Sequence, residues 1–452
     1  MIRRDSQLKE LTGQALSWMP ANWWPEIILL LLFVAAGVVI DCRLASHLDI
    51  DSHRYLEIGE NLYAGRGFVV TSESGIIGPD FSRTPILPAL IAAALIICGG
   101  KSSAAILLVV WIQRIAWALA VLWAMPRTIG RGGGFRRWTF CGKLVLLFSP
   151  AVLWHSALLL TDVPYATGLL VLLCMMRRVV RRQMGVGGAL CSGAVHGILT
   201  LTRPFHLLAP LAELAPWFFA RRWRMLTLVL IPAFLLPGVW MLRNSRQGQP
   251  WTLTTVGGRS LALHQHSNIL ALPAEDAPGR YGAAFVRAMH STDEGAYTAA
   301  WILKRDYNLG DAEVDRIARD VAVAAIKRRP VIYLREVLRN LGRLVFSPID
   351  GANLARALGN SEQVIRLAGV FNAIWGLLCF LVVPLYLALC RIPGRLLGTS
   401  WAVSLLLLGA YLVVLPAMTT VTYGRFILPL LPLLGILYCA ADIEPRRTRP
   451  AT

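Results

Sequence analysis

The stretch that decides the fold of this chain runs from His47 to Gly67, with the sequence His-Leu-Asp-Ile-Asp-Ser-His-Arg-Tyr-Leu-Glu-Ile-Gly-Glu-Asn-Leu-Tyr-Ala-Gly-Arg-Gly. It follows the first long apolar segment, at about 27–43. Twelve of its residues, 49–60, carry four carboxylates, a histidine, an arginine and a tyrosine. The whole chain is 56% hydrophobic and only 16% charged. So polar a cluster beside an apolar segment predicts a functional loop at a membrane surface.

The composition supports a membrane protein outside this stretch as well. The chain has 452 residues, 15 of them Trp, and many apolar runs of about 18 or more residues, which is typical of polytopic helical membrane proteins. The net charge of +19 lies in short loops between apolar runs, where it reports topology, so nucleic-acid binding is excluded. The eight Cys form no CxxC pair, which argues against a zinc site or a disulfide framework.

The basic clusters assign the two sides of the membrane. Arg3, Arg4 and Lys9 precede the first apolar segment and place the N-terminus inside. Segment 84–98 is short and holds two prolines, so we expect it to be re-entrant or interfacial. Every later basic cluster, and both termini, then fall inside if the chain crosses the membrane ten times. The expected spans are about 27–43, 103–125, 144–160, 163–176, 185–201, 205–219, 225–242, 367–389, 399–419 and 426–441.

These spans divide the chain into three parts. Residues 1–243 form a transmembrane catalytic core with a first outer loop, 44–102; residues 244–366 form one large outer segment; residues 367–452 add transmembrane helices and a basic tail. In the outer segment we expect a loop from Trp251 to Tyr281, helices from about 295 to 345, and an amphipathic interfacial helix over 331–345. The fold class is therefore an all-α polytopic membrane protein.

Two acids on the outer face could carry chemistry. Asp51, Arg54 and Tyr55 lie within one turn if a helix begins there with Asp51 or Ser52 as its N-cap. Asp162 reaches the same face at the end of a distant span. Acids that converge from separate helices suit general-base catalysis or metal binding. Asp49 is an alternative to Asp51 as the first-loop acid.

At these residues the chain resembles a known family. Asp51-Ser-His-Arg54-Tyr55 is similar to the D-x-x-R-Y pattern of the lipid A aminoarabinose transferases, which belong with the protein O-mannosyltransferases to the GT-C membrane glycosyltransferases. The resemblance covers roughly the first 245 residues and the last 30. Further matches, in order, are Arg83-Thr-Pro85-Ile-Leu-Pro88, Ser149-Pro150, Thr161-Asp162-Val-Pro164, Thr202-Arg203-Pro204 and Tyr423-Gly-Arg425-Phe-Ile-Leu-Pro429.

The resemblance implies a GT-C helical bundle in which Asp51 is the essential first-loop acid. Several members of the family have Asp-Glu at this point, whereas Asp51 is followed here by Ser52. Metal ligation by a paired acid is therefore left open. If the protein uses a divalent cation, Mg or Mn, Asp51 and Asp162 are the ligands to expect.

The chemical class of the sugar donor follows from the side of the membrane that the active site is expected to face. No nucleotide-sugar pool exists outside the cytoplasmic membrane, and the chain has no P-loop or Gly-rich nucleotide fingerprint. An outward-facing transferase must then take its sugar from a polyprenyl phosphate, such as undecaprenyl phosphate. The leaving phosphate needs cations, for which Arg83, Arg203 and Arg425 at outer helix ends are candidates.

Five further residues are expected to contact substrate: Arg54, Tyr55, His264, His266 and Tyr423. His264 and His266 resemble a metal pair only superficially, because side chains at i and i+2 share a face only in a strand. For these two histidines we therefore expect substrate contact rather than metal binding.

These observations predict a bacterial inner-membrane GT-C glycosyltransferase whose active site faces the periplasm. Besides the donor and the membrane lipids, its partner is a lipid, glycan or protein acceptor, and Asp51 drives an inverting displacement. One alternative is an O-antigen ligase or polymerase type, which relies on Arg and His in the large outer loop. Another is a carrier that moves a lipid-linked glycan without chemistry.

Overall fold

The structure is a computed structural model that describes residues 24–71, 77–126, 137–180, 185–219, 222–291, 295–346, 349–390, 400–419 and 428–440. Helices make up nearly all of it, as the sequence predicts. In the N-terminal half they are α2 (Trp24–Arg43), α3 (Ile50–Tyr63), α4 (Ile86–Ile97), α5 (Ser102–Leu119), η1 (Ala120–Ala124), α7 (Arg137–Phe148), α8 (Pro150–Ser156), α9 (Asp162–Val180), α10 (Val186–Thr202), η2 (Pro204–Leu208), α11 (Ala209–Phe219) and α12 (Trp223–Arg246).

The second half is built in the same way. Its elements are α13 (Gly257–His264), α14 (His266–Leu270), η3 (Ala274–Asp276), α15 (Gly282–His290), α16 (Ala296–Tyr307), α17 (Asp311–Arg328), α18 (Pro330–Phe346), α19 (Ile349–Ala357), α20 (Glu362–Leu377), η4 (Leu378–Val382), α21 (Val383–Cys390), α23 (Ser400–Thr419) and α24 (Leu431–Ala440). The sequence did not predict the antiparallel pair β1 (Val69–Thr71) and β2 (Ile77–Pro79) in the first outer loop.

The helices make this a multi-pass membrane protein. Within the described ranges, four helices are long and apolar enough to cross a membrane: Trp24–Arg43, Ser102–Ala124, Trp223–Arg246 and Ala402–Thr419. The count of ten spans stays a prediction. Segment 84–98 forms α4, whose 12 residues extend about 18 Å at 1.5 Å per residue. That length is well short of the ~30 Å hydrocarbon core, as expected for a segment that does not span.

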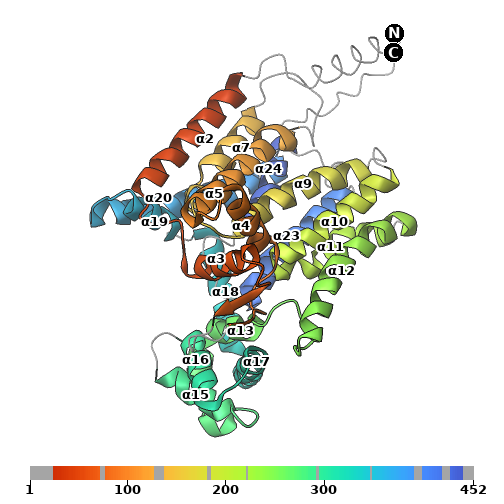
Figure 1. Ribbon diagram of the computed structural model, residues 1–452. Coiled ribbons are helices and arrows are strands. Elements are labelled where there is room, and N and C mark those ends of the chain that lie inside the picture. The colour runs from red at the N-terminus through yellow and green to blue at the C-terminus, as the bar shows by residue number, and fades with distance from the viewer. Residues whose placement is uncertain are drawn as a thin grey trace, which may run out of the picture.

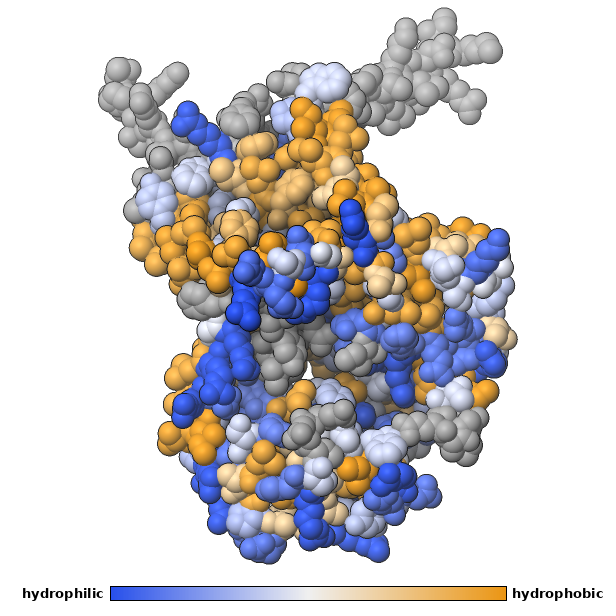
Figure 2. Space-filling view, turned by 90° about the vertical axis from the view of Figure 1, so that its left-hand side faces the viewer, coloured by the Kyte–Doolittle hydropathy of each residue, from blue (hydrophilic) through white to orange (hydrophobic). Residues whose placement is uncertain are grey.

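The polar and apolar parts separate along the molecule. In Figure 1 the start of α2 lies at the top, the helices α13 and α15–α17 lie at the bottom, and α3 lies between them. Figure 2 shows apolar side chains over the upper body and hydrophilic side chains around the middle and the lower part. The helix α3 therefore lies where the apolar body meets the polar part of the molecule.

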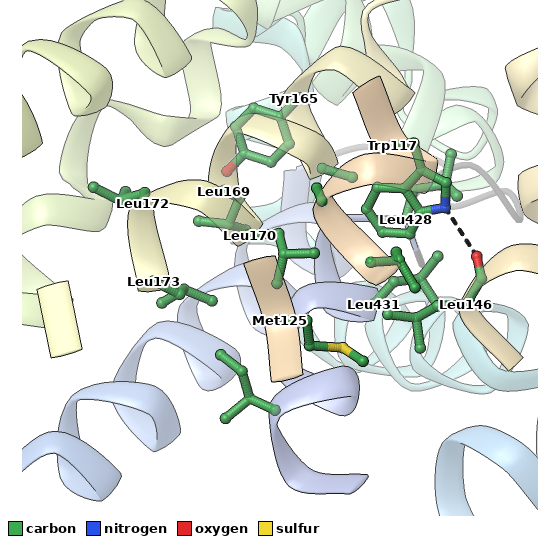
Figure 3. Packing of buried hydrophobic residues seen from close by; sticks show 14 of the residues in the cluster. Trp117, Met125, Leu146, Tyr165, Leu169, Leu170, Leu172, Leu173, Leu428 and Leu431 are labelled. Atoms are coloured by element: carbon green, nitrogen blue, oxygen red, sulfur yellow. Dashed lines mark hydrogen bonds between the residues drawn. The ribbon is translucent and has the colours of Figure 1, made fainter. Parts of the chain in front are cut away.

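The centre of the apolar body is packed around α9. Leu169, Leu170 and Leu173 on this helix are fully buried, and beside them the indole N–H of Trp117 donates to the Leu146 carbonyl at 2.9 Å (Figure 3). Close packing of this kind fixes the positions of the helix ends, because a shift of even one methylene in a dense core disturbs the packing of its neighbours.

The predicted span 144–160 is not one continuous helix, because it is broken between α7 and α8, where Pro150 follows Ser149 and the Ser149 hydroxyl accepts from the Val152 N–H at 3.3 Å. That this segment crosses the membrane stays a prediction. One expectation about segment 244–366 is wrong. The predicted loop from Trp251 to Tyr281 contains α13 and α14. The start of α13 is capped by the Asp315 carboxylate from α17, a tertiary contact that local sequence patterns do not show. The helices expected over about 295–345 are confirmed.

An ion pair inside the body holds α2 against α5. Arg114, only 2% exposed, donates to both carboxylate oxygens of Asp41 at 2.6 and 2.7 Å. We expect Arg114→Met to lower the free energy of unfolding by about 3 kcal/mol, because it leaves a carboxylate that is only 13% exposed without its cation. Equilibrium unfolding in detergent measures the loss. The double variant Asp41→Leu/Arg114→Met should recover most of it, and equal losses in the single and double variants would contradict this explanation.

Candidate active site

The polar cluster at 47–67 folds mainly as α3. The helix begins at Ile50, so the expected caps Asp51 and Ser52 both lie inside it, and the Ser52 hydroxyl accepts from the Asp49 N–H at 3.0 Å. This places Asp51 in the first turn. His47 ties the loop to the segment before α9: its Nδ1–H donates to the Ala157 carbonyl at 2.7 Å, and its carbonyl accepts from the Leu159 N–H. The first outer loop and the start of α9 are therefore neighbours.

Asp80, which no sequence pattern singled out, organises the turn after β2. Its fully buried carboxylate accepts from the backbone N–H groups of Ser82 and Arg83 at 3.0 and 2.9 Å, and from Arg54 Nε at 2.8 Å. A short side chain that binds the backbone two and three residues ahead is characteristic of an Asx turn. Pro79-Asp80 followed by Ser82 was the available signal. The turn presents Arg83 to α3.

The first acid–arginine pair joins Asp51 and Arg83 at 2.7 Å. The Arg83 guanidinium also lies over the Tyr55 ring, 5.1 Å from its centroid. Burial disfavours the charge of Arg83, but Tyr55, Asp51 and Asp80 outweigh it, so the pKa of this guanidinium lies above its ordinary value. Burial also raises the pKa of the Tyr55 phenol. At neutral pH the site thus holds a charged arginine against a neutral phenol.

The second pair joins Asp162 and Arg203, which are in direct hydrogen-bond contact. Asp162 stands in the first turn of α9, where the helix dipole favours a carboxylate. Arg203 lies between α10 and η2, with its guanidinium carbon 5.3 Å from the Phe205 ring centroid. Both side chains are nearly buried, with exposed fractions of 1% for Asp162 and 9% for Arg203.

Tyr55 lies between the two pairs. The Arg83 guanidinium lies over its ring, and its phenol is hydrogen-bonded to the Thr161 side chain. Thr161 in turn lies 3.4 Å from Arg203 Nε. The structure thus brings together five of the residues that the sequence singled out.

The remaining sequence candidates are placed as follows. Arg54 lies beside the site and binds Asp80. His264 is buried elsewhere: its Nε2–H donates to the Ala417 carbonyl at 2.7 Å and its Nδ1 accepts from Gln265, which ties α13 to α23. His266 lies against Gly295. Tyr423 and Arg425 lie outside the described residues.

The two acids of the site are not arranged to bind a divalent cation. Asp51 and Asp162, the ligands to expect, are each bound by a guanidinium. In the part of the chain that the structure describes, no group of three or more His, Cys, Asp and Glu side chains could hold a metal ion. These residues do not fit an Mg or Mn site, and positive charge at the site comes from arginine.

Comparison with known proteins shows no family for this chain. No family model matches the chain, and no curated protein matches it. The structure is similar to that of the archaeal oligosaccharyltransferase AglB from Archaeoglobus fulgidus, solved in complex with an inhibitory peptide and a dolichol-phosphate. The TM-score is 0.46 and the identity 15%, over 93% of this chain. The match covers 50% of AglB, so the chain spans half of that protein's length.

Two structures of ArnT from Cupriavidus metallidurans are also similar, each with a TM-score of 0.37. The one bound to undecaprenyl phosphate is 19% identical over 90% of this chain and 77% of ArnT. The apo structure is 16% identical over 91% and 76%. These similarities are weak, with every TM-score below 0.5, and the GT-C helical bundle that the motifs implied stays a prediction.

Proposed function

We propose that this protein is a glycosyltransferase that moves a sugar from a polyprenyl phosphate, such as undecaprenyl phosphate, to a lipid, glycan or protein acceptor. The reaction takes place on the periplasmic face of the bacterial cytoplasmic membrane. One observation carries the proposal: two acid–arginine pairs, Asp51–Arg83 and Asp162–Arg203, lie beside an apolar helical body with Tyr55 between them.

The exposure of the two acids supports different roles for them. The Asp51 side chain is 29% exposed, whereas the Asp162 side chain is 1% exposed. A general base must come within hydrogen-bond distance of the group that it deprotonates, so Asp51 is the base. Asp162 holds Arg203 in place. Asp49 lies before α3, and its backbone contact with Ser52 helps to set the start of that helix.

The arginines bind the leaving phosphate. A guanidinium presents several donors in one plane and binds phosphate oxygens in pairs, which suits a group that gains negative charge as the bond to the sugar breaks. An incoming phosphate competes with the carboxylates for Arg83 and Arg203. Donor binding therefore frees the Asp51 carboxylate to receive a proton.

The transfer is a single displacement. The acceptor hydroxyl gives its proton to Asp51, and its oxygen forms a bond to the anomeric carbon. The bond from that carbon to the phosphate oxygen breaks, and its electron pair stays on the phosphate. A polyprenyl phosphate leaves and the anomeric configuration is inverted, because the enzyme forms no covalent intermediate. We place acceptor recognition in the outer segment 244–366.

The proposal is tested with purified full-length protein, a radiolabelled polyprenyl-phosphate sugar and a membrane lipid extract. We expect labelled acceptor and free polyprenyl phosphate to appear in equal amounts. A carrier without chemistry would release no polyprenyl phosphate. An O-antigen ligase or polymerase type would lose activity with His264→Ala or His266→Ala and keep it with Asp51→Asn, and that pattern would contradict the proposal.

A further inference from the structure

A row of four buried polar side chains extends from the site into the helical body. Tyr165 comes from α9, His196 from α10, His206 from η2 and Glu213 from α11. The first three have no exposed surface and Glu213 is 2% exposed. Ionisable groups are costly inside an apolar body and by default indicate function. The displacement proposed at Asp51 uses none of the four.

The side chains contact one another in sequence. The Tyr165 hydroxyl lies 2.7 Å from His206 Nδ1, and His206 Nε2 lies 3.0 Å from His196 Nδ1, with the two rings stacked. His196 Nε2 lies 3.5 Å from a carboxylate oxygen of Glu213, without a hydrogen bond between the two atoms. When the phenol donates to His206, both rings carry their proton on Nε2, and the two hydrogen bonds run in one direction from Tyr165 through His206 to His196. Each tautomer is thus set by its neighbour.

The row is attached to Arg203 by two contacts. The backbone N–H of His206 donates to the backbone carbonyl of Arg203 at 3.0 Å, within the turn that follows the arginine. The Tyr165 ring centroid lies 6.0 Å from the guanidinium carbon, one helical turn after Asp162. The hydrogen bond between His206 and Tyr165 therefore fixes the turn that carries Arg203 against the helix that carries Asp162. A shift of either residue moves the guanidinium relative to its carboxylate.

We propose that Tyr165, His206 and His196, with Glu213 at the far end, form a positioning network that orients Arg203 for the phosphate of the polyprenyl donor. This inference rests on the proposed function, and it assigns positioning residues to the same site. The four residues act through Arg203 and none of them touches substrate. A network that only stabilised the bundle would be independent of Arg203, and a double-mutant cycle separates the two cases.

The experiment measures the affinity of purified full-length protein for undecaprenyl phosphate in detergent. Tyr165→Phe keeps the ring beside Arg203 and removes the hydroxyl. We expect binding to weaken about 10-fold, because a small misplacement of a binding group is costly. In the Arg203→Ala background the same change should have no further effect. Tyr438→Phe is the matched control: this phenol is 2% exposed, donates to the Cys379 carbonyl in the same body, and should leave the affinity unchanged.

Three outcomes overturn the inference. Tyr165→Phe could leave binding unchanged, or it could weaken binding equally in both backgrounds, which is the result for a purely stabilising network. If Arg203→Ala itself binds as tightly as wild type, the phosphate contact of the proposed function fails and the inference fails with it. His206→Asn breaks the row at its centre and gives the same comparison if Tyr165→Phe does not fold.

Discussion

Asp51→Asn is expected to lower the turnover of sugar transfer about 10³-fold while the protein remains folded, within the range that a positioned general base contributes. Asparagine has the shape of aspartate and retains an oxygen that can accept from Arg83, which lies 2.7 Å from the native carboxylate. It cannot take up the proton of an acceptor hydroxyl. The loss should therefore appear in kcat, with the affinity for the donor changed little.

The controls for this prediction come from the same stretch of chain. Asp49→Asn makes the same chemical change two residues earlier, and we expect it to transfer sugar at close to the wild-type rate. Thermal unfolding of each variant in detergent confirms that it is folded. If Asp49→Asn is inactive and Asp51→Asn is active, the first-loop acid has been assigned to the wrong residue. Full activity of both variants would remove the aspartate from the mechanism.

The convergence of Asp51 and Asp162 followed from topology, because basic loops fix which helix ends share a face. The partners of these acids could not be predicted in the same way. Asp51 and Arg83 are 32 residues apart, and they meet because the Asp80 turn folds the chain back onto α3. A turn of this kind depends on one buried carboxylate, which sequence periodicity does not reveal.

The contact partners of the buried histidines also could not be predicted from the sequence. His206 and Tyr165 are 41 residues apart, and each looks like an ordinary polar interruption of an apolar segment. Their contact depends on how α9, α10 and η2 pack together. The sequence pattern also did not indicate that the His264 ring is buried between α13 and α23, and the substrate contact expected of it stays a prediction. In both cases burial, which local composition does not give, determines what the side chain does.

Arg203→Ala is expected to lower kcat/KM for the polyprenyl donor about 10³-fold, the upper range for removing one preorganised donor to a developing negative charge. The guanidinium is 9% exposed, so its interaction with phosphate is little weakened by solvent. Arg203→Lys keeps the charge but loses the planar fork, and we expect a smaller loss, about 10-fold. Steady-state kinetics with varied donor concentration measure both effects.

The alanine variant also leaves Asp162 buried without its guanidinium, so a loss of stability could imitate a loss of catalysis. The double variant Asp162→Asn/Arg203→Ala separates the two effects, because it removes the uncompensated charge but not the missing phosphate contact. We expect it to unfold near the wild-type temperature and to remain about 10³-fold impaired. Arg246→Ala removes an exposed arginine at the end of α12 and should retain full activity. Recovery of activity in the double variant would show that Arg203 only neutralises Asp162, and the phosphate site would then have to be sought at Arg83.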